Sequence, residues 1–89
     1  MSYKILFSKE ALKGLKFLAQ KKALLKNAQE IIELLKVDPY KNPPPYEKLV
    51  GDLTGCFSRR INIQHRLVYT VDEDKKEALI HSAWSHYEF

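Results

Sequence analysis

The spacing of hydrophobic residues predicts one strand followed by two helices in the first part of the chain. Alternating positions over residues 3–7 predict a strand. Ser8 is a suitable helix N-cap, and Glu10 lies in the first turn, where the helix dipole favours an anion. Apolar residues then recur at helical spacing over residues 11–19 and again over residues 24–35. We therefore expect two consecutive helices.

A proline-rich loop is predicted after the second helix. This helix should end near Val37, because the pair Asp38-Pro39 disfavours a continued helix. Residues 38–46 follow as a loop that contains the run Pro43-Pro44-Pro45. Such a run serves either as a ligand for a proline-reading domain or as a stiff connector. We favour the connector, which would deliver Glu47 in a fixed direction.

The rest of the chain predicts an antiparallel meander. Strands are expected over residues 56–63, 66–71 and 77–84, with turns at residues 62–65 and 72–74. Two helices on one face of a mostly antiparallel sheet make an α+β fold. This arrangement leaves the other face of the sheet without a helix.

Length and composition indicate one small globular domain over residues 1–89, with 45% hydrophobic and 11% aromatic residues. No apolar run approaches the ~20 residues needed to cross a bilayer, and no secretory signal is expected. Cys56 is the only cysteine, so an internal disulfide is excluded and a reducing cytoplasm fits. Nothing next to Cys56 would activate a thiolate, and we expect it to pack rather than react.

Positive charge is concentrated in the first half of the chain. The net charge is +4, yet residues 1–45 hold nine lysines against four acidic residues, and residues 46–89 have a net charge of −1. A basic half favours a polyanion such as RNA. A solvated, lysine-rich helix surface explains the same distribution, and charge alone does not choose between them.

Strand alternation sorts the side chains of the meander onto two faces. In the strand at 56–63, one face carries Phe57, Arg59, Ile61 and Ile63, and the other carries Ser58, Arg60 and Asn62. In the next strand, Arg66 is opposed to the apolar set Leu67, Tyr69 and Val71. Arg60 and Arg66 should therefore share the helix-free face, where guanidinium groups suit phosphate. Salt bridges to Glu47 or Asp52 are the alternative.

The chain ends with a histidine that is able to transfer protons. His86 can give and take a proton near neutral pH, and the neighbouring Tyr87 can stack on a base. A histidine near a chain end is also commonly a solvated surface residue, and His65 and His81 are weaker candidates. Three histidines and one cysteine at scattered spacing match no zinc motif, and no glycine-rich phosphate loop is present. We therefore expect no metal and no other cofactor.

Five segments carry a family resemblance: Glu47-Lys48-Leu49, Gly51-Asp52-Leu53-Thr54-Gly55, Ser58-Arg59-Arg60-Ile61-Asn62, His65-Arg66-Leu67-Val68-Tyr69 and Ser85-His86-Tyr87. In this order and spacing they resemble the YoeB/Txe branch of the RelE toxin superfamily. The resemblance implies a RelE-like fold and cleavage of mRNA in the ribosomal A site, and the basic helices would then serve as a docking surface for ribosomal RNA. It also implies a cytoplasmic protein that a cognate YefM/Axe-type antitoxin neutralises, with operator DNA contacted only through that antitoxin. A homodimer is compatible with it, and no membrane partner is implied.

The resemblance also assigns roles to individual residues. Glu47 occupies the place of the general base, Arg66 that of the arginine supporting the phosphate, and His86 that of the general acid. The reaction would be a metal-independent transesterification in which the RNA 2′-OH attacks, leaving 2′,3′-cyclic phosphate and 5′-OH ends. Alternatives are a non-catalytic ribosome- or RNA-binding module and an antitoxin-bound co-repressor.

Substrate-binding positions in the resemblance fall on Arg60 and Tyr87, with Lys48 as a further candidate. Two departures from the family pattern bear on the site. Val50 stands where relatives often carry a lysine, and Lys48 would point to another face of an extended segment. The chain also continues past Tyr87 through Glu88 and Phe89, which adds a negative charge beside the proposed acid.

Overall fold

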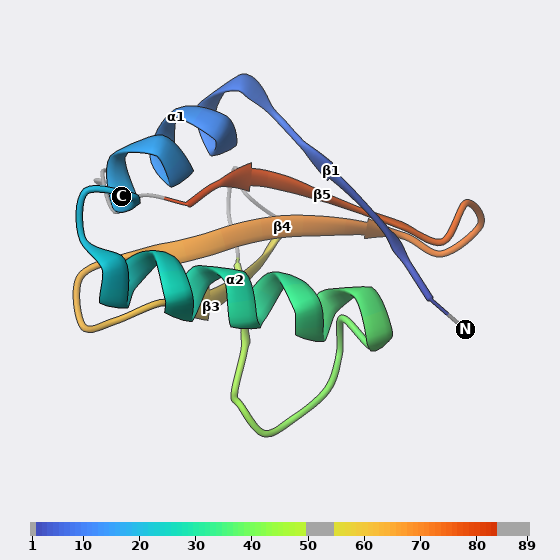
Figure 1. Ribbon diagram of the computed structural model, residues 1–89. Coiled ribbons are helices and arrows are strands. Elements are labelled where there is room, and N and C mark those ends of the chain that lie inside the picture. Colours follow the sequence, from blue (N-terminus) through green and yellow to red (C-terminus); the bar gives the residue numbers. More distant parts are fainter. Residues whose placement is uncertain (1, 50–54, 84–89) are drawn as a thin grey trace.

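The computed structural model describes residues 2–49 and 55–83, and it contains two helices and a five-stranded sheet (Figure 1). Along the chain the elements are β1 (Lys4–Phe7), α1 (Lys9–Leu18), α2 (Lys22–Val37), β2 (Glu47–Lys48), β3 (Phe57–Arg60), β4 (Arg66–Asp72) and β5 (Glu77–Ser82). The predicted order of one strand, two helices and a meander is confirmed. No helix in the described ranges is long and apolar enough to cross a bilayer.

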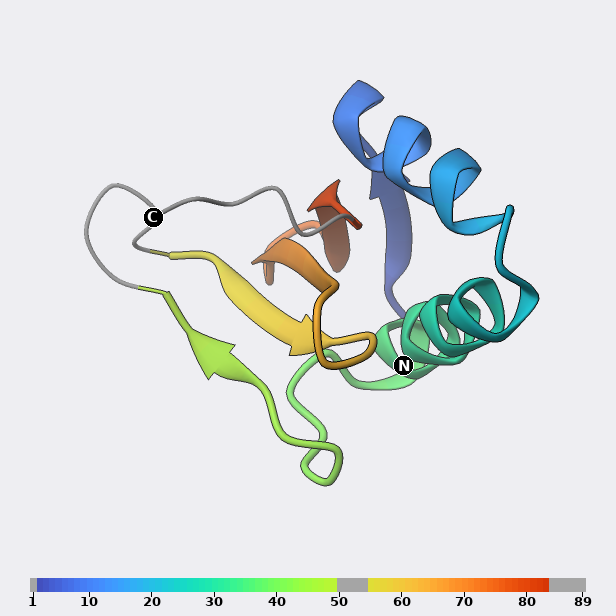
Figure 2. The same ribbon diagram turned by 90° about the vertical axis from the view of Figure 1, so that its left-hand side faces the viewer.

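The sheet is mixed, with the strand order β1-β5-β4-β3-β2. β1 pairs in parallel with β5, and the other neighbours pair in antiparallel fashion. Both helices lie on one side of the sheet (Figure 2). The expected α+β class with a mostly antiparallel sheet is therefore confirmed, and within residues 2–49 and 55–83 no helix covers the other face of β3 and β4.

The core fills the space between the helix pair and the sheet. Leu67 and Tyr69 on β4 and Ile80 on β5 are fully buried there. Leu18 from α1 and Leu35 from α2 pack against them. The alternation of β4 is confirmed, because its apolar set points toward the helices and Arg66 stands on the other face.

Capping determines where α1 begins and attaches it to the sheet. The Ser8 hydroxyl accepts a hydrogen bond from the Ala11 N–H at 3.0 Å and donates one to the His81 carbonyl at 2.7 Å. Such a cap contributes about 1 kcal/mol to helix stability. The predicted N-cap is confirmed, and it also connects α1 to β5.

The strand predicted over residues 56–63 is shorter than expected and spans only Phe57–Arg60. After Arg60, the Asn62 side chain binds backbone N–H groups and forms a turn in place of further strand pairing. The Asn62 side-chain oxygen accepts hydrogen bonds from the N–H groups of Gln64 at 2.8 Å and His65 at 2.6 Å. This turn ends β3 and leaves Ile63 87% exposed, so the prediction that Ile63 continues the strand face was wrong. β5 likewise ends at Ser82, and position 84 lies outside the described residues.

Candidate functional site

Arg60 and Arg66 lie directly opposite each other on the helix-free face of the sheet. They are cross-strand partners in the antiparallel pair β3–β4. This is the juxtaposition that alternation predicts for the two arginines. Two guanidinium groups held opposite each other repel, so a neighbouring anion stabilises the pair.

Glu47 provides a carboxylate beside these arginines. It lies on β2, where it pairs with Ser58 of β3. Its Oε2 atom is 3.4 Å from Arg66 Nη1, and the two side chains are 64% and 35% exposed, respectively. An ion pair this long and this exposed contributes at most about 1 kcal/mol. The predicted salt-bridge alternative is therefore present, but a bound anion can replace it at little cost.

These residues surround a cavity of about 240 Å³, which is lined by Pro45, Glu47, Ser58, Arg60 and Arg66. It combines one carboxylate, one hydroxyl and two guanidinium groups. This chemistry suits a phosphate diester, because guanidinium groups bind phosphoryl oxygens and a carboxylate can accept a proton. Sequence reasoning did not name Ser58 or Pro45 as site residues, although alternation had already placed Ser58 on the same face as Arg60.

The remaining predicted site residues are placed in different ways. Lys48 does not line this cavity, and its partner in the strand register is Phe57 on the core side, in agreement with the expected opposite face. His86 and Tyr87 lie outside the described residues, as do Val50 and the Glu88-Phe89 extension. The structure thus brings together Glu47, Arg60 and Arg66 from the predicted set.

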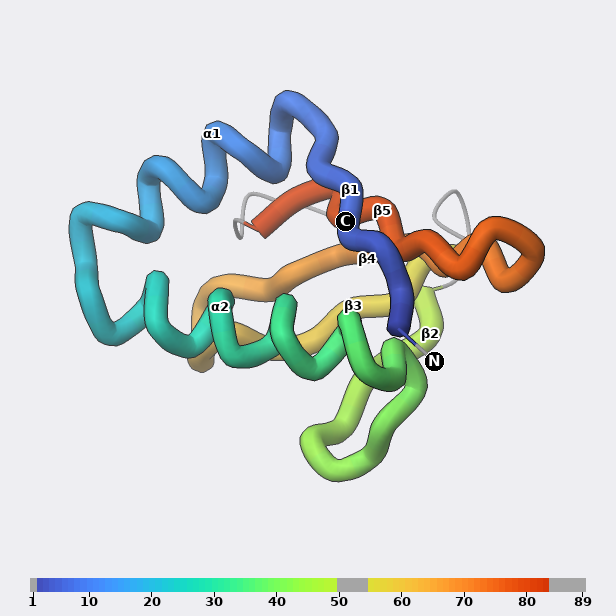
Figure 3. Tube along the Cα trace, turned by 45° about the vertical axis from the view of Figure 1, so that its right-hand side comes forward, coloured from blue at the N-terminus to red at the C-terminus, as the bar shows by residue number. Residues whose placement is uncertain are grey.

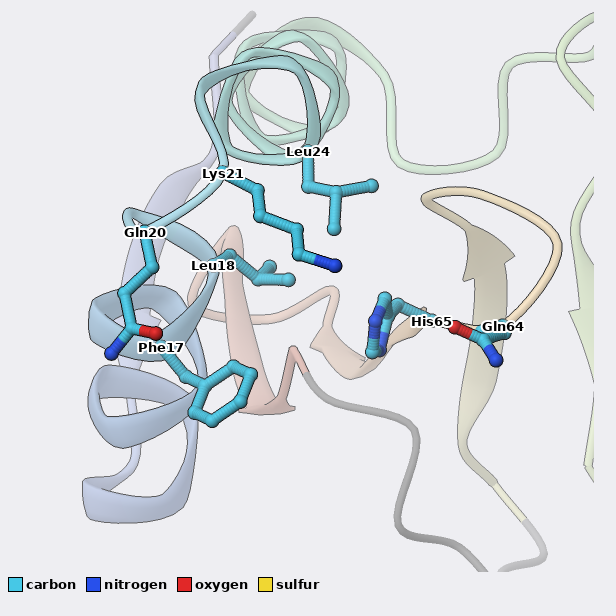
Figure 4. A pocket seen from close by; sticks show the side chains of 7 residues that line it. All are labelled: Phe17, Leu18, Gln20, Lys21, Leu24, Gln64 and His65. Carbon is cyan, nitrogen blue, oxygen red and sulfur yellow. The ribbon is translucent and has the colours of Figure 1, made fainter.

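The two other histidines are held elsewhere. His81 Nε2 lies 2.9 Å from the Thr70 hydroxyl on the neighbouring strand. His65 lines a second cavity, of about 440 Å³, between the corner joining the helices and the turn before β4 (Figure 4). Phe17 and Lys21 extend toward that space, which contains none of the predicted catalytic residues. Among the described residues, no three His, Cys, Asp or Glu side chains gather as a metal would require.

Arg59 is a further residue near the site to which sequence reasoning gave no role. It is 1% exposed and faces the helix side of β3, as alternation predicts. Its guanidinium donates hydrogen bonds to the carbonyls of Pro44 at 2.7 Å, Pro39 at 3.0 Å and Lys41 at 2.8 Å. These bonds fasten to β3 the loop that leads from α2 to β2, whose course can be followed in Figure 3. This attachment agrees with the interpretation of the proline run as a stiff connector.

Two aromatic residues complete the surroundings of Arg59. Arg59 Nε donates to the Tyr69 hydroxyl at 3.1 Å, and that hydroxyl donates to the Pro39 carbonyl at 2.8 Å. Burial raises the pKa of Tyr69, and its hydrogen bond with Arg59 opposes the shift. The guanidinium also lies over the Tyr46 ring, with 4.9 Å between its central carbon and the ring centroid. Tyr46 immediately precedes Glu47.

Comparison with known proteins places this chain in a family. The model of the YoeB-like toxin of bacterial type II toxin–antitoxin systems matches residues 7–87. Toxin YoeB of Synechocystis sp. is 40% identical over 67 residues, which cover 75% of this chain and 76% of that protein. Toxin YoeB of Escherichia coli K12 is 36% identical over 66 residues, which cover 74% and 76%, respectively.

Solved structures agree with the sequence comparisons. A chain of the YoeB–YefM complex from Staphylococcus aureus superposes with a TM-score of 0.81 at 36% identity, covering 98% of this chain and all of that one. The archaeal RelE–RelB complex from Pyrococcus horikoshii, at 24% identity, has a TM-score of 0.78 with full coverage of both chains, which shows the shared RelE-like fold. This chain therefore belongs to the family of YoeB-like toxins of bacterial type II toxin–antitoxin systems.

Proposed function

We propose that the protein is a ribosome-dependent endoribonuclease that inhibits translation by cutting mRNA in the ribosomal A site. The observation that supports this most directly is the cavity in which the Glu47 carboxylate meets the guanidinium groups of Arg60 and Arg66. RNA carries its own nucleophile, the 2′-OH, so the protein needs only to bind the phosphate and transfer protons. The two guanidinium groups can bind the phosphate, and the carboxylate can accept the 2′-OH proton.

The proposed reaction moves two protons and exchanges one phosphoester bond for another. Glu47 accepts the proton of the 2′-OH while that oxygen bonds to the phosphorus. Arg66, with Arg60, stabilises the negative charge that grows on the phosphoryl oxygens. His86 donates a proton to the departing 5′-oxygen. The products are a 2′,3′-cyclic phosphate and a 5′-OH end, and each proton transfer contributes about 10²–10⁴ to the rate.

The ion pair of Glu47 and Arg66 suits this exchange. Because it is long and exposed, a phosphate can take over Arg66 and leave the carboxylate free to accept the 2′-OH proton. Arg66 can then bind two phosphoryl oxygens at once, a geometry that lysine cannot reproduce. The protein groups in this scheme need no metal.

The proposed partners follow from the family and the charge distribution. The matching chain from S. aureus belongs to a YoeB–YefM complex, and a YoeB dimer from the same organism also superposes on this chain. We propose that a YefM/Axe-type antitoxin neutralises this toxin in the cytoplasm, that the toxin can form a homodimer, and that operator DNA is reached only through the antitoxin. Exposed lysines on both helices would contact ribosomal RNA.

The proposal is tested by incubating the purified toxin with ribosomes programmed with a defined mRNA. Wild-type protein should cut the message and leave cyclic phosphate ends, which phosphatase removes only after acid opening. Glu47→Gln and His86→Gln should each lower cleavage by about 10²–10⁴ while ribosome binding persists. Wild-type protein that binds ribosomes and leaves the mRNA intact would instead establish the non-catalytic module. Tight operator binding with the antitoxin, combined with no growth arrest by the toxin alone, would favour the co-repressor.

A further inference from the structure

Arg59 lies directly behind the candidate site, and the proposed reaction does not use it. We propose that Arg59 is a positioning residue that holds the Glu47 carboxylate in place for proton transfer, by fastening the proline-rich loop and Tyr46 to β3. This inference rests on the proposed nuclease function and adds a residue to its machinery. Arg59 itself does not line the cavity that holds Glu47, so its effect must pass through the backbone that carries Glu47.

Only an arginine can make this set of contacts. The three loop carbonyls belong to residues 39, 41 and 44, and the fourth acceptor is the Tyr69 hydroxyl from the neighbouring strand. A planar fork of five N–H donors reaches all four at once, whereas a lysine ammonium carries three donors on a single nitrogen. The ion pairs within residues 2–49 and 55–83 do not include Arg59, so loop carbonyls provide much of the polar environment of its buried charge.

Arg59 contacts Tyr46, the residue immediately before Glu47. The guanidinium packs on the Tyr46 ring, and that ring also meets Phe57 edge-on with centroids 5.7 Å apart. Tyr46 immediately precedes β2, so fixing its ring against Arg59 and Phe57 constrains the backbone from which Glu47 extends toward Arg66. β2 contains only two residues, so its pairing with β3 alone would hold Glu47 weakly.

The two faces of β3 thus carry different parts of the site, the phosphate-binding group and the group that holds the loop. Arg60 points toward the cavity, while Arg59, one residue earlier, holds the loop on the opposite face. The distance between the carboxylate and the phosphate-binding groups is consequently set by one short strand. A displacement of about 1 Å in such a geometry can cost about 10²-fold in rate.

The test is single-turnover cleavage of mRNA on programmed ribosomes with the full-length toxin. The exponential rate constant reports the folded molecules, and the amplitude reports their fraction. Arg59→Lys keeps the charge and should lower the rate constant by about 10- to 100-fold, with ribosome affinity changed less than about threefold. The matched control is Leu18→Met, a volume-conserving change in a fully buried residue of α1, which lies on the opposite side of the molecule from the loop (Figure 1), and it should leave the rate constant unchanged.

A double-mutant cycle separates positioning of Glu47 from a general structural effect. In the Glu47→Gln background, Arg59→Lys should lower the residual rate by less than about twofold, because the group that it positions is already gone. Equal factors in both backgrounds, or a loss of amplitude at an unchanged rate constant, would overturn the inference. Tyr46→Phe keeps the ring and should keep the rate constant, whereas Tyr46→Leu should lower it.

Hydrogen exchange reports on the loop without any RNA. The amides of Lys41, Tyr46 and Glu47 should exchange faster in Arg59→Lys than in wild type, and at the wild-type rate in Leu18→Met. Unchanged exchange and an unchanged rate constant in Arg59→Lys would refute the role of Arg59 while the nuclease proposal stands. Wild-type protein that fails to cleave mRNA would refute both, even if the exchange result showed that Arg59 fastens the loop.

Discussion

The Tyr69 hydroxyl allows the strength of the loop attachment to be measured. Tyr69→Phe removes one oxygen and keeps the ring, which is fully buried and stacks on Phe57 with centroids 5.6 Å apart. Two hydrogen bonds disappear, one from Arg59 Nε at 3.1 Å and one to the Pro39 carbonyl at 2.8 Å. Pro39 keeps its second donor from Arg59, so the Arg59 Nε–H is the group left without an acceptor.

The expected magnitude follows from this unequal loss. A hydrogen bond to a charged group is worth about 1.5–3 kcal/mol, and a buried donor left unmatched costs a similar amount. We therefore expect Tyr69→Phe to lower the free energy of unfolding by about 2 kcal/mol, which for a domain of this size lowers Tm by about 8–16 °C.

Urea unfolding followed by circular dichroism measures this change directly. The matched control is Tyr40→Phe, because Tyr40 lies in the same loop but is 36% exposed. That substitution should cost less than about 1 kcal/mol. Equal stabilities of Tyr69→Phe and wild type, within about 0.5 kcal/mol, would show that these hydrogen bonds do not hold the loop and would weaken the argument for Arg59.

Three further predictions concern the site, the first helix and alkaline pH. Arg66→Gln should lower mRNA cleavage by about 10²-fold or more while the melting temperature stays near that of wild type, because its exposed ion pair with Glu47 adds little stability; a large loss of stability would contradict this. Ser8→Ala should cost about 1 kcal/mol or more in urea unfolding, since the cap and the bond to β5 are both lost. Burial is the main cause that raises the pKa of Tyr40 to about 12, with the negative charge of Glu73 acting in the same direction, so this phenol stays protonated in the folded protein where the unfolded chain has already ionised. The contribution of Tyr40 to the free energy of unfolding is therefore fully present below about pH 10 and is lost as pH rises toward 12. In Tyr40→Phe, the free energy of unfolding should fall less between pH 10 and 12 than it does in wild type.

Local signals in the sequence were sufficient for much of the fold. The Ser8 cap, the end of α2 at Val37 and the alternation of β4 depend on neighbours within a few residues, and the structure confirms each. The parallel pairing of β1 with β5 joins residues more than 70 positions apart, and no local pattern encodes it. The turn at Asn62, by contrast, depends on a local interaction that the strand pattern hides. Hydrogen bonds to the Asn62 side-chain oxygen there outweigh the β propensity of the apolar residues around it.

The candidate site depends on both kinds of information, and Arg59 and Arg60 show how they differ. Alternation alone assigned Arg60 to the helix-free face and paired it with Arg66, because that argument needs only the strand period. The same alternation assigned Arg59 to the core side, where a buried cation without hydrogen-bond acceptors would be costly. Alternation alone could not identify those acceptors. Those partners are carbonyls 15 to 20 residues earlier in the chain, in a loop with no periodic pattern. A buried arginine beside a predicted phosphate-binding arginine therefore indicates a segment that must be held close to the site, and here that segment leads directly into Glu47.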